Sequence, residues 1–125
     1  MTALLLDTHV IVWWATANAR LHSSWAEPIA APENRVYMSA ASVWEIEIKK
    51  RADKLAFEFD VLDLTDEYGF EPMEISPQDA AAAGALDWEH RDPFDRMLVA
   101  QAMRRNLTLV SADDAVRAAP GIRVL

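Results

Sequence analysis

The sequence has no cysteine, little glycine and no long apolar run. Without cysteine among its 125 residues, the chain cannot be a disulfide scaffold, a zinc ribbon or a cysteine-nucleophile enzyme. No apolar run approaches the roughly 18 residues of a membrane span. Residues 3–6 are apolar but follow no basic residue, unlike the start of a secretory signal. We therefore expect a cytoplasmic protein with no membrane partner.

Basic residues are also scarce. Twelve lysines and arginines face twenty acids, which gives a formal net charge of -8. This balance argues against a protein that coats nucleic acid, because such proteins neutralise phosphates with Lys and Arg. It leaves a nuclease open, since acids that converge on a divalent cation create a phosphate-binding site together with that cation. The positions of the acids are therefore the informative feature.

The composition, 52% hydrophobic and 26% charged, predicts one globular domain over residues 1–125. Short apolar runs predict buried strands at residues 4–6, 36–38 and 107–110, with weaker candidates at 70–75 and 122–125. Helical patterns occupy the intervals, at residues 9–17, 24–31, 40–51, 58–68, 77–85, 94–105 and 114–118. Strands that alternate with helices predict an α/β fold of three layers, in which helices cover both faces of a central parallel sheet of about five strands.

Carboxylates follow the predicted strands. Asp7 comes directly after the first strand, and Glu45 lies in the helix that follows the second. Asp113 comes two residues after Ser111, at the end of a later strand, and Asp95 lies near the start of another helix. Because ligands bind outside the carboxyl ends of the strands in such a sheet, four separate segments are predicted to deliver acids to one edge.

Helix capping is the local alternative for several of these acids. Asp7 and Asp113 could each cap the following helix, and Asp92 is suited to cap a helix whose first residue is Pro93. Ser42 and Glu45 match a capping box, but a helix that starts at Ser39 puts Glu45 inside it, on an apolar face.

Asp95 also shares a face with apolar residues, and capping does not explain acids in such positions. Oxygen ligands without a Cys or a His pair favour Mg²⁺ or Mn²⁺ over zinc. The three histidines have no metal-ligand spacing, so we assign no catalytic role to His9, His22 or His90.

Four segments of the chain, residues 4–11, 39–46, 90–102 and 109–113, resemble the acid-bearing motifs of the PIN-domain ribonucleases. Within that family the chain is similar to the VapC-type toxins of bacterial toxin–antitoxin modules. The resemblance implies a metal-dependent endoribonuclease with Mg²⁺, or Mn²⁺ in its place. It implies the catalytic residues Asp7, Glu45, Asp95 and Asp113. Asp7 and Asp95 are the expected principal metal ligands, with Asp113 completing the site, Glu45 orienting the attacking water, and Glu45 and Asp92 as further candidate ligands.

Other residues near these acids are candidates for RNA contacts or for supporting the metal ligands. The hydroxyl groups are those of Thr8, Ser39, Ser42 and Ser111, which could equally be helix caps. Arg91 and Arg96 flank the third acid and could position RNA. Basic residues also end the helix of Glu45, at Lys49, Lys50, Arg51 and Lys54, where a solvated helix end is the alternative. Three tryptophans, Trp13, Trp14 and Trp44, are expected in the core or an interface, with base stacking as the alternative.

The resemblance implies an RNA substrate, a homodimer and a VapB-like antitoxin. An apolar excess around Trp13 and Trp14 agrees with an interface.

Two alternatives stay open: a PIN-domain binding module whose acidic pocket accepts a partner's Arg, and a housekeeping RNA-processing nuclease without a toxin role. A receiver domain is disfavoured because Asp7 stands alone and the last lysine is Lys54. A haloacid-dehalogenase-like phosphatase would need an acid where His9 stands.

Overall fold

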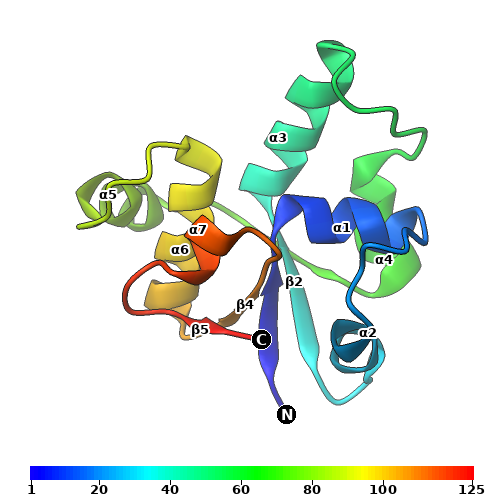
Figure 1. Ribbon diagram of the computed structural model, residues 1–125, viewed down its shortest axis with the longest axis horizontal. Helices are drawn as coiled ribbons and strands as arrows, with labels where there is room; N and C mark the ends of the chain where they lie inside the picture. The colour runs from blue at the N-terminus through cyan, green and yellow to red at the C-terminus, as the bar shows by residue number, and fades with distance from the viewer.

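A computed structural model describes residues 1–125 and shows a five-stranded sheet with helices on both faces (Figure 1). All neighbouring strands pair in parallel, in the order β3-β2-β1-β4-β5. The strands are β1 (Ala3–Leu6), β2 (Arg35–Ser39), β3 (Glu71–Met73), β4 (Thr108–Val110) and β5 (Arg123–Val124). The predicted α/β class, with a central parallel sheet of about five strands, is confirmed.

Helices connect the strands and form the two outer layers. They are α1 (Thr8–Ala15), α2 (Ser23–Ala30), α3 (Ala40–Arg51), the 3₁₀ turn η1 (Val61–Asp63), α4 (Leu64–Tyr68), α5 (Pro77–Ala85), α6 (Pro93–Arg105) and α7 (Asp114–Arg117). In Figure 1, α1, α2 and α4 lie on one side of the strands, and α5, α6 and α7 lie on the other. No helix combines the length and the apolar character needed to cross a bilayer.

The apolar runs form strands because both faces of the sheet are covered. Along β1, Leu4 and Leu6 pack into one buried cluster with Val10 and Ile11, whereas Leu5 packs into a second cluster with Leu98 and others. Side chains alternate between the two faces of a strand, so an unbroken run of leucines fits only a strand that is buried on both sides. The result is two cores separated by the sheet.

One predicted helix is shorter than expected. Residues 58–68 were predicted as one helix, but the structure has η1 followed by α4, which begins at Leu64. Asp60 accepts the backbone N–H of Leu62 and thereby starts a tight turn, and Asp and Asn favour such local contacts over helix interiors. Gly69 then ends α4 in the left-handed conformation, with φ 71°. The helix prediction over residues 58–63 was therefore wrong.

Candidate active site

The carboxyl ends of the strands open into one acid-lined pocket of about 270 Å³. Four segments contribute to it: the β1–α1 junction, α3, the start of α6 and the β4–α7 junction. All four predicted catalytic acids line it, together with His9, Lys49 and Asp92. The full lining is Asp7, Thr8, His9, Val12, Trp13, Glu45, Lys49, Leu55, Asp92, Asp95 and Asp113. The sequence prediction that these carboxylates meet at one edge agrees with this arrangement.

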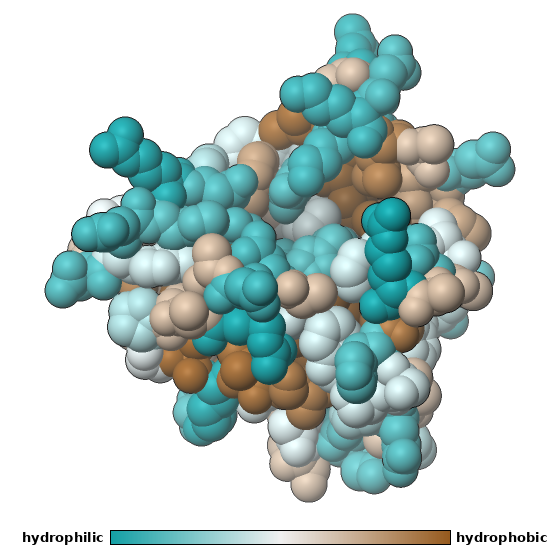
Figure 2. All heavy atoms as spheres, in the orientation of Figure 1, coloured by the Kyte–Doolittle hydropathy of each residue, from teal (hydrophilic) through white to brown (hydrophobic).

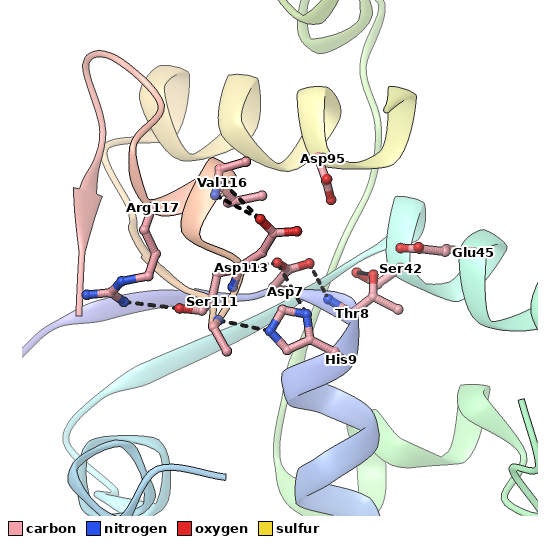
Figure 3. A network of polar contacts seen from close by, with 12 residues as sticks. Asp7, Thr8, His9, Ser42, Glu45, Asp95, Ser111, Asp113, Val116 and Arg117 are labelled. Carbon is pink, nitrogen blue, oxygen red and sulfur yellow. Dashed lines mark hydrogen bonds and ion pairs between the residues drawn. The ribbon is translucent and has the colours of Figure 1, made fainter. Parts of the chain in front are cut away.

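Asp7 lies at the centre of the site, where β1 ends and α1 begins (Figure 3). One carboxylate oxygen accepts the backbone N–H of Thr8 at 2.7 Å, and the other accepts the hydroxyl of Ser111 at 2.6 Å. Burial raises the pKa of Asp7, while His9 and the hydrogen bonds from Ser111 and Thr8 offset part of that rise. Asp7 is therefore both a helix cap and a nearly buried carboxylate, so the two readings of this residue are compatible.

Ser111 and Asp113 join the end of β4 to the same site. The Ser111 hydroxyl accepts the backbone N–H of Asp113 at 3.1 Å while it donates to Asp7. Asp113 is the N-cap of α7, where it accepts the backbone N–H groups of Ala115 and Val116. Figure 3 shows the Asp113 carboxylate beside that of Asp7.

Glu45 extends from the second turn of α3 into the pocket and is 7% exposed. Its carboxylate accepts a hydrogen bond from the Lys49 ammonium at 2.7 Å, one helical turn further along α3. This contact raises the pKa of Lys49. Because an isolated charge on a buried helix face is costly, the lysine explains how Glu45 is tolerated there.

Asp95 lies in the first turn of α6, with its carboxylate 2.6 Å from Nε2 of His90. Burial raises its pKa to about 6, the hydrogen bond from His90 lowers it, and the nearby charges of Asp7 and Asp92 add to the rise. Asp92 caps α6 by accepting the N–H groups of Phe94 and Asp95. The predicted capping role of Asp92 is confirmed, although it also lines the pocket.

Thr8 and Ser42 tie the first and third helices together below the acids. The Thr8 hydroxyl donates to the Ser42 hydroxyl at 2.9 Å, and both residues are buried. Through this contact the start of α1, which carries Asp7, is fixed against the helix that carries Glu45. Thr8 and Ser42 therefore connect the two helices that flank the pocket, and their contact with RNA stays a prediction.

Ser39 was predicted near the site, but it is buried under α6 and does not line the pocket. It is the N-cap of α3, as expected, and its hydroxyl donates to the side chain of Gln101 at 2.6 Å. Met38 packs into the first core and Tyr37 against the second, and Ser39 follows the same alternation toward α6. As a contact to RNA or to a metal ligand, the Ser39 prediction was wrong.

Arg96 was predicted to contact RNA, but its guanidinium is occupied by the protein itself. Its N–H groups donate to backbone carbonyl groups between α5 and α6, those of Ala83, Gly84, Leu86, Trp88 and His90. The prediction that Arg96 is free to bind the phosphates of RNA was therefore wrong. Arg91 is exposed, beside the pocket-lining residue Asp92, and its RNA contact stays a prediction.

Two histidines to which no catalytic role was assigned, His9 and His90, contact the acids. Nε2 of His9 accepts the backbone N–H of Ala112 at 2.9 Å, which places the proton of the neutral ring on Nδ1, 3.5 Å from Asp7. His90 contacts Asp95 more closely and through its other ring nitrogen, with Nε2 at 2.6 Å from the carboxylate. The signal available in the sequence was proximity alone, because His9 follows Asp7 by two residues and His90 precedes Asp95 by five.

The donor chemistry of the pocket fits a hard divalent cation. Carboxylate oxygens are the ligands that Mg²⁺ and Mn²⁺ prefer. Burial raises the pKa values of Asp7 and Asp95, and a bound cation would stabilise the charged forms of both carboxylates. In the structure no three His, Asp or Glu side chains are arranged as a formed metal site. Lys49 and His90 instead contact two of the acids.

Known proteins are similar to this chain over nearly its whole length. The model of the PIN domain matches residues 4–122. Ribonuclease VapC22 of Mycobacterium tuberculosis is 28% identical over 120 residues, which cover 94% of this chain and 92% of that protein. The crystal structure of VapBC2 from Rickettsia felis bound to a promoter DNA fragment is similar with a TM-score of 0.71 and 16% identity, covering 99% and 98% of the two chains. DNA-bound VapBC from Salmonella typhimurium is similar with a TM-score of 0.66 and 21% identity, covering 100% and 98%.

Proposed function

Because the chain belongs to the PIN domain family, we propose that it is a metal-dependent endoribonuclease that acts as the toxin of a toxin–antitoxin pair. One observation carries the nuclease proposal: four acids from separate segments line one pocket at the carboxyl edge of a parallel sheet. The relative in Mycobacterium tuberculosis is named a ribonuclease VapC, and this supports RNA as the substrate. A toxin that cleaves cellular RNA acts where that RNA is found, and we therefore propose a cytoplasmic location.

Asp7 and Asp95 would hold the cation, Mg²⁺ or Mn²⁺, with Asp113 completing the site and Asp92 as a further candidate. When bound, the cation neutralises phosphate charge and lowers the pKa of water. Glu45 lines the same pocket, where its carboxylate can orient the attacking water. In hydrolysis the water oxygen bonds to phosphorus, one phosphodiester P–O bond breaks, and the leaving oxygen takes a proton.

Basic side chains would position the RNA against these acids. Lys49 lies in the pocket beside Glu45, and Arg91 is exposed next to Asp92. Phosphate contacts of this kind set the register of a nucleic acid without reading its sequence.

The test is cleavage of purified RNA by the purified protein, with Mg²⁺, with Mn²⁺ and with chelator. We expect cleavage with either cation and none with chelator. Asp7→Asn and Asp95→Asn should abolish cleavage while circular dichroism stays unchanged. Asp66→Asn is the matched control, because Asp66 is an exposed acid on α4. A parent protein that cuts neither tRNA, rRNA nor mRNA with either cation would favour a binding module.

The toxin role is separable from the nuclease activity. Expression of the parent chain alone should arrest bacterial growth, Asp7→Asn should not, and a neighbouring gene for a small DNA-binding protein should relieve the arrest. Normal growth of cells that contain a cleavage-competent parent protein would favour a housekeeping nuclease.

For the antitoxin we propose a segment that places a basic side chain among the acids of the pocket. The two similar crystal structures are of VapBC proteins bound to DNA, and an acid-lined pocket attracts Lys or Arg of a partner. Replacing the basic residues of the antitoxin tail by Ala should weaken inhibition. Full inhibition by that variant would favour simple steric blockade.

The homodimer proposal rests on exposed apolar side chains. Trp13 and Trp14 pack against the protein's own core, so the apolar excess inferred from them does not supply an interface. Instead Trp44 is 61% and Leu62 is 66% exposed, and Figure 2 shows hydrophobic side chains beside α3. Light scattering at micromolar concentration should show a dimer that Leu62→Glu disrupts and Met103→Glu does not. A monomeric parent would contradict the proposal.

A further inference from the structure

Arg96 is placed directly after Asp95 in α6, yet it faces away from the acids. Its guanidinium donates to the carbonyl oxygens of Trp88 at 2.7 Å, Leu86 at 2.9 Å, Ala83 and His90 at 3.0 Å, and Gly84 at 3.5 Å. A guanidinium has five N–H donors in a rigid planar arrangement. The side chain is thus fully engaged with the α5–α6 connection, and its charge is balanced by backbone dipoles.

The connection has little else to define its shape. Its residues 86–91 make one backbone–backbone hydrogen bond among themselves, from Trp88 N–H to Leu86 O. Ala83 and Gly84 belong to the last turn of α5, whose carbonyl groups have no partner within the helix. Arg96 therefore both caps α5 and holds the backbone that leads to α6.

The same backbone carries His90 to Asp95. The His90 ring stacks on Trp88, with ring centroids 4.6 Å apart and an interplanar angle of 23°, and its Nε2 lies 2.6 Å from Asp95. Arg96 binds the main-chain carbonyls of these same two residues. Consecutive residues of α6 thus hold the two sides of one loop residue: Arg96 the backbone of His90, and Asp95 its ring.

We propose that Arg96 is a positioning residue for the carboxylate of Asp95, acting through His90. By fixing the 86–91 backbone it sets the place of the imidazole, and the imidazole sets the orientation of the carboxylate. Groups that orient a metal ligand change metal affinity by roughly 10–100-fold when they are removed. This inference rests on the proposed function only in taking Asp95 as a cation ligand.

The variant Arg96→Lys keeps the charge but cannot span five carbonyl groups. In metal-free protein we expect the His90 ring resonances to move toward those of an exposed histidine. We expect Mn²⁺ affinity to fall about tenfold, within the range for groups that orient a ligand, and kcat to fall with little change in KM. Arg20→Lys is the matched control, because Arg20 is exposed and does not line the pocket. Unchanged His90 resonances or unchanged Mn²⁺ affinity in Arg96→Lys would overturn the proposal.

A double-mutant cycle tests whether the effect passes through His90. If it does, Arg96→Lys lowers Mn²⁺ affinity in the parent but has almost no further effect in His90→Ala. An equal loss in both backgrounds would show that Arg96 acts by another route.

The parent protein supplies a test that survives an unfolded variant. Through-hydrogen-bond couplings from the Arg96 side-chain nitrogens to the carbonyl carbons of Trp88 and His90 should be observable, and the Arg96 Nε proton should exchange slowly. Fast exchange without such couplings would overturn the positioning role. These measurements need no cleavage, so a protein that fails to cut RNA but shows them would refute the proposed function alone.

Discussion

Asp92 and Asp95 lie one helical turn apart, but they meet different partners. Asp92 accepts two backbone N–H groups at the start of α6. Asp95 instead contacts His90, and the charge of Asp7 contributes to the raised pKa of Asp95. Asn caps a helix about as well as Asp, so Asp92→Asn removes charge while keeping the cap. We predict that Asp92→Asn loses less RNA-cleavage activity than Asp95→Asn in side-by-side rate measurements. The reverse order would make Asp92 the main third acid.

The raised pKa of Asp95 makes stability depend on pH. Burial raises this pKa to about 6, whereas Asp in an unfolded chain ionises near pH 4. Between about pH 4 and pH 6 the folded state holds a proton that the unfolded state has released, so this group lowers the free energy of unfolding as pH rises. In metal-free buffer, the melting temperature of Asp95→Asn minus that of the parent should therefore increase from pH 4 to pH 7.

Subtracting the parent removes the contributions of all other titrating groups that the substitution leaves unchanged. Asp66→Asn should give a difference that stays constant over the same range. A constant difference for Asp95→Asn as well would mean that its carboxyl ionises normally in the folded protein.

At the level of single residues, the sequence located the acids better than their supporting groups. Asp7 was predictable because it directly follows a buried strand, Asp113 because it comes within three residues of the end of another, and Glu45 because it stands on an apolar helix face. Arg96 was not, since its acceptors are main-chain carbonyls in a connection without a periodic pattern. Ser39 could have been assigned to the other face of the sheet, because Val36 and Met38 alternate with it along β2.

A buried ionic cluster joins α5 and α6 on the far side of the sheet from α1. Asp79 is completely buried, forms a capping box with Ser76, and accepts hydrogen bonds from Gln101, Arg104 and Arg105. Burial acts to raise the pKa of Asp79, but these hydrogen bonds outweigh it and hold the pKa well below its usual range. The cluster fixes α6, the helix that Asp92 caps and whose first turn carries Asp95.

We predict that Asp79→Ala destabilises the protein by about 3 kcal/mol, the lower end of the range for breaking a buried ion pair, because both arginines are partly exposed and can turn to water. The measurement is urea unfolding at neutral pH. Asp60→Ala is the control for losing a cap alone, since Asp60 caps η1 without such a network, and it should cost about 1 kcal/mol. Equal losses for the two variants would show that the arginine contacts add nothing.

Elements with strong patterns were predictable, and the α3–β3 connection was not. Residues 40–51 and 77–85 were predicted as helices with the bounds that the structure gives to α3 and α5. Between them, Val61 and Leu64 are buried, a spacing that a short 3₁₀ turn and a helix satisfy equally well. The hydrogen bond from the Leu62 N–H to the Asp60 side chain favours the turn. The spacing of hydrophobic residues does not reveal this contact.

For the whole molecule, a divalent cation should act as a ligand of the folded state. The acids converge only when β1, α3, α6 and the β4–α7 junction are assembled, so the unfolded chain has no comparable site. Saturating Mg²⁺ or Mn²⁺ should therefore raise the melting temperature by mass action, and Asp7→Asn should erase most of that increase. Differential scanning fluorimetry measures these melting temperatures. Equal increases in the parent and in Asp7→Asn would place the cation elsewhere.

The strand order also fixes when the site can exist during synthesis. β1 is made first, yet its neighbour β4 is among the last strands made, and Leu4 pairs with Thr108 across that gap. The hydroxyl of Ser111 reaches back to Asp7 over 104 positions of sequence. A ribosome that has added residues up to 107 has already supplied Asp7, Glu45 and Asp95, but neither the strand nor the serine that completes their surroundings. The pocket is thus completed only after the ribosome has passed Ser111, so an incomplete chain that stops before β4 carries three of the acids without a finished site.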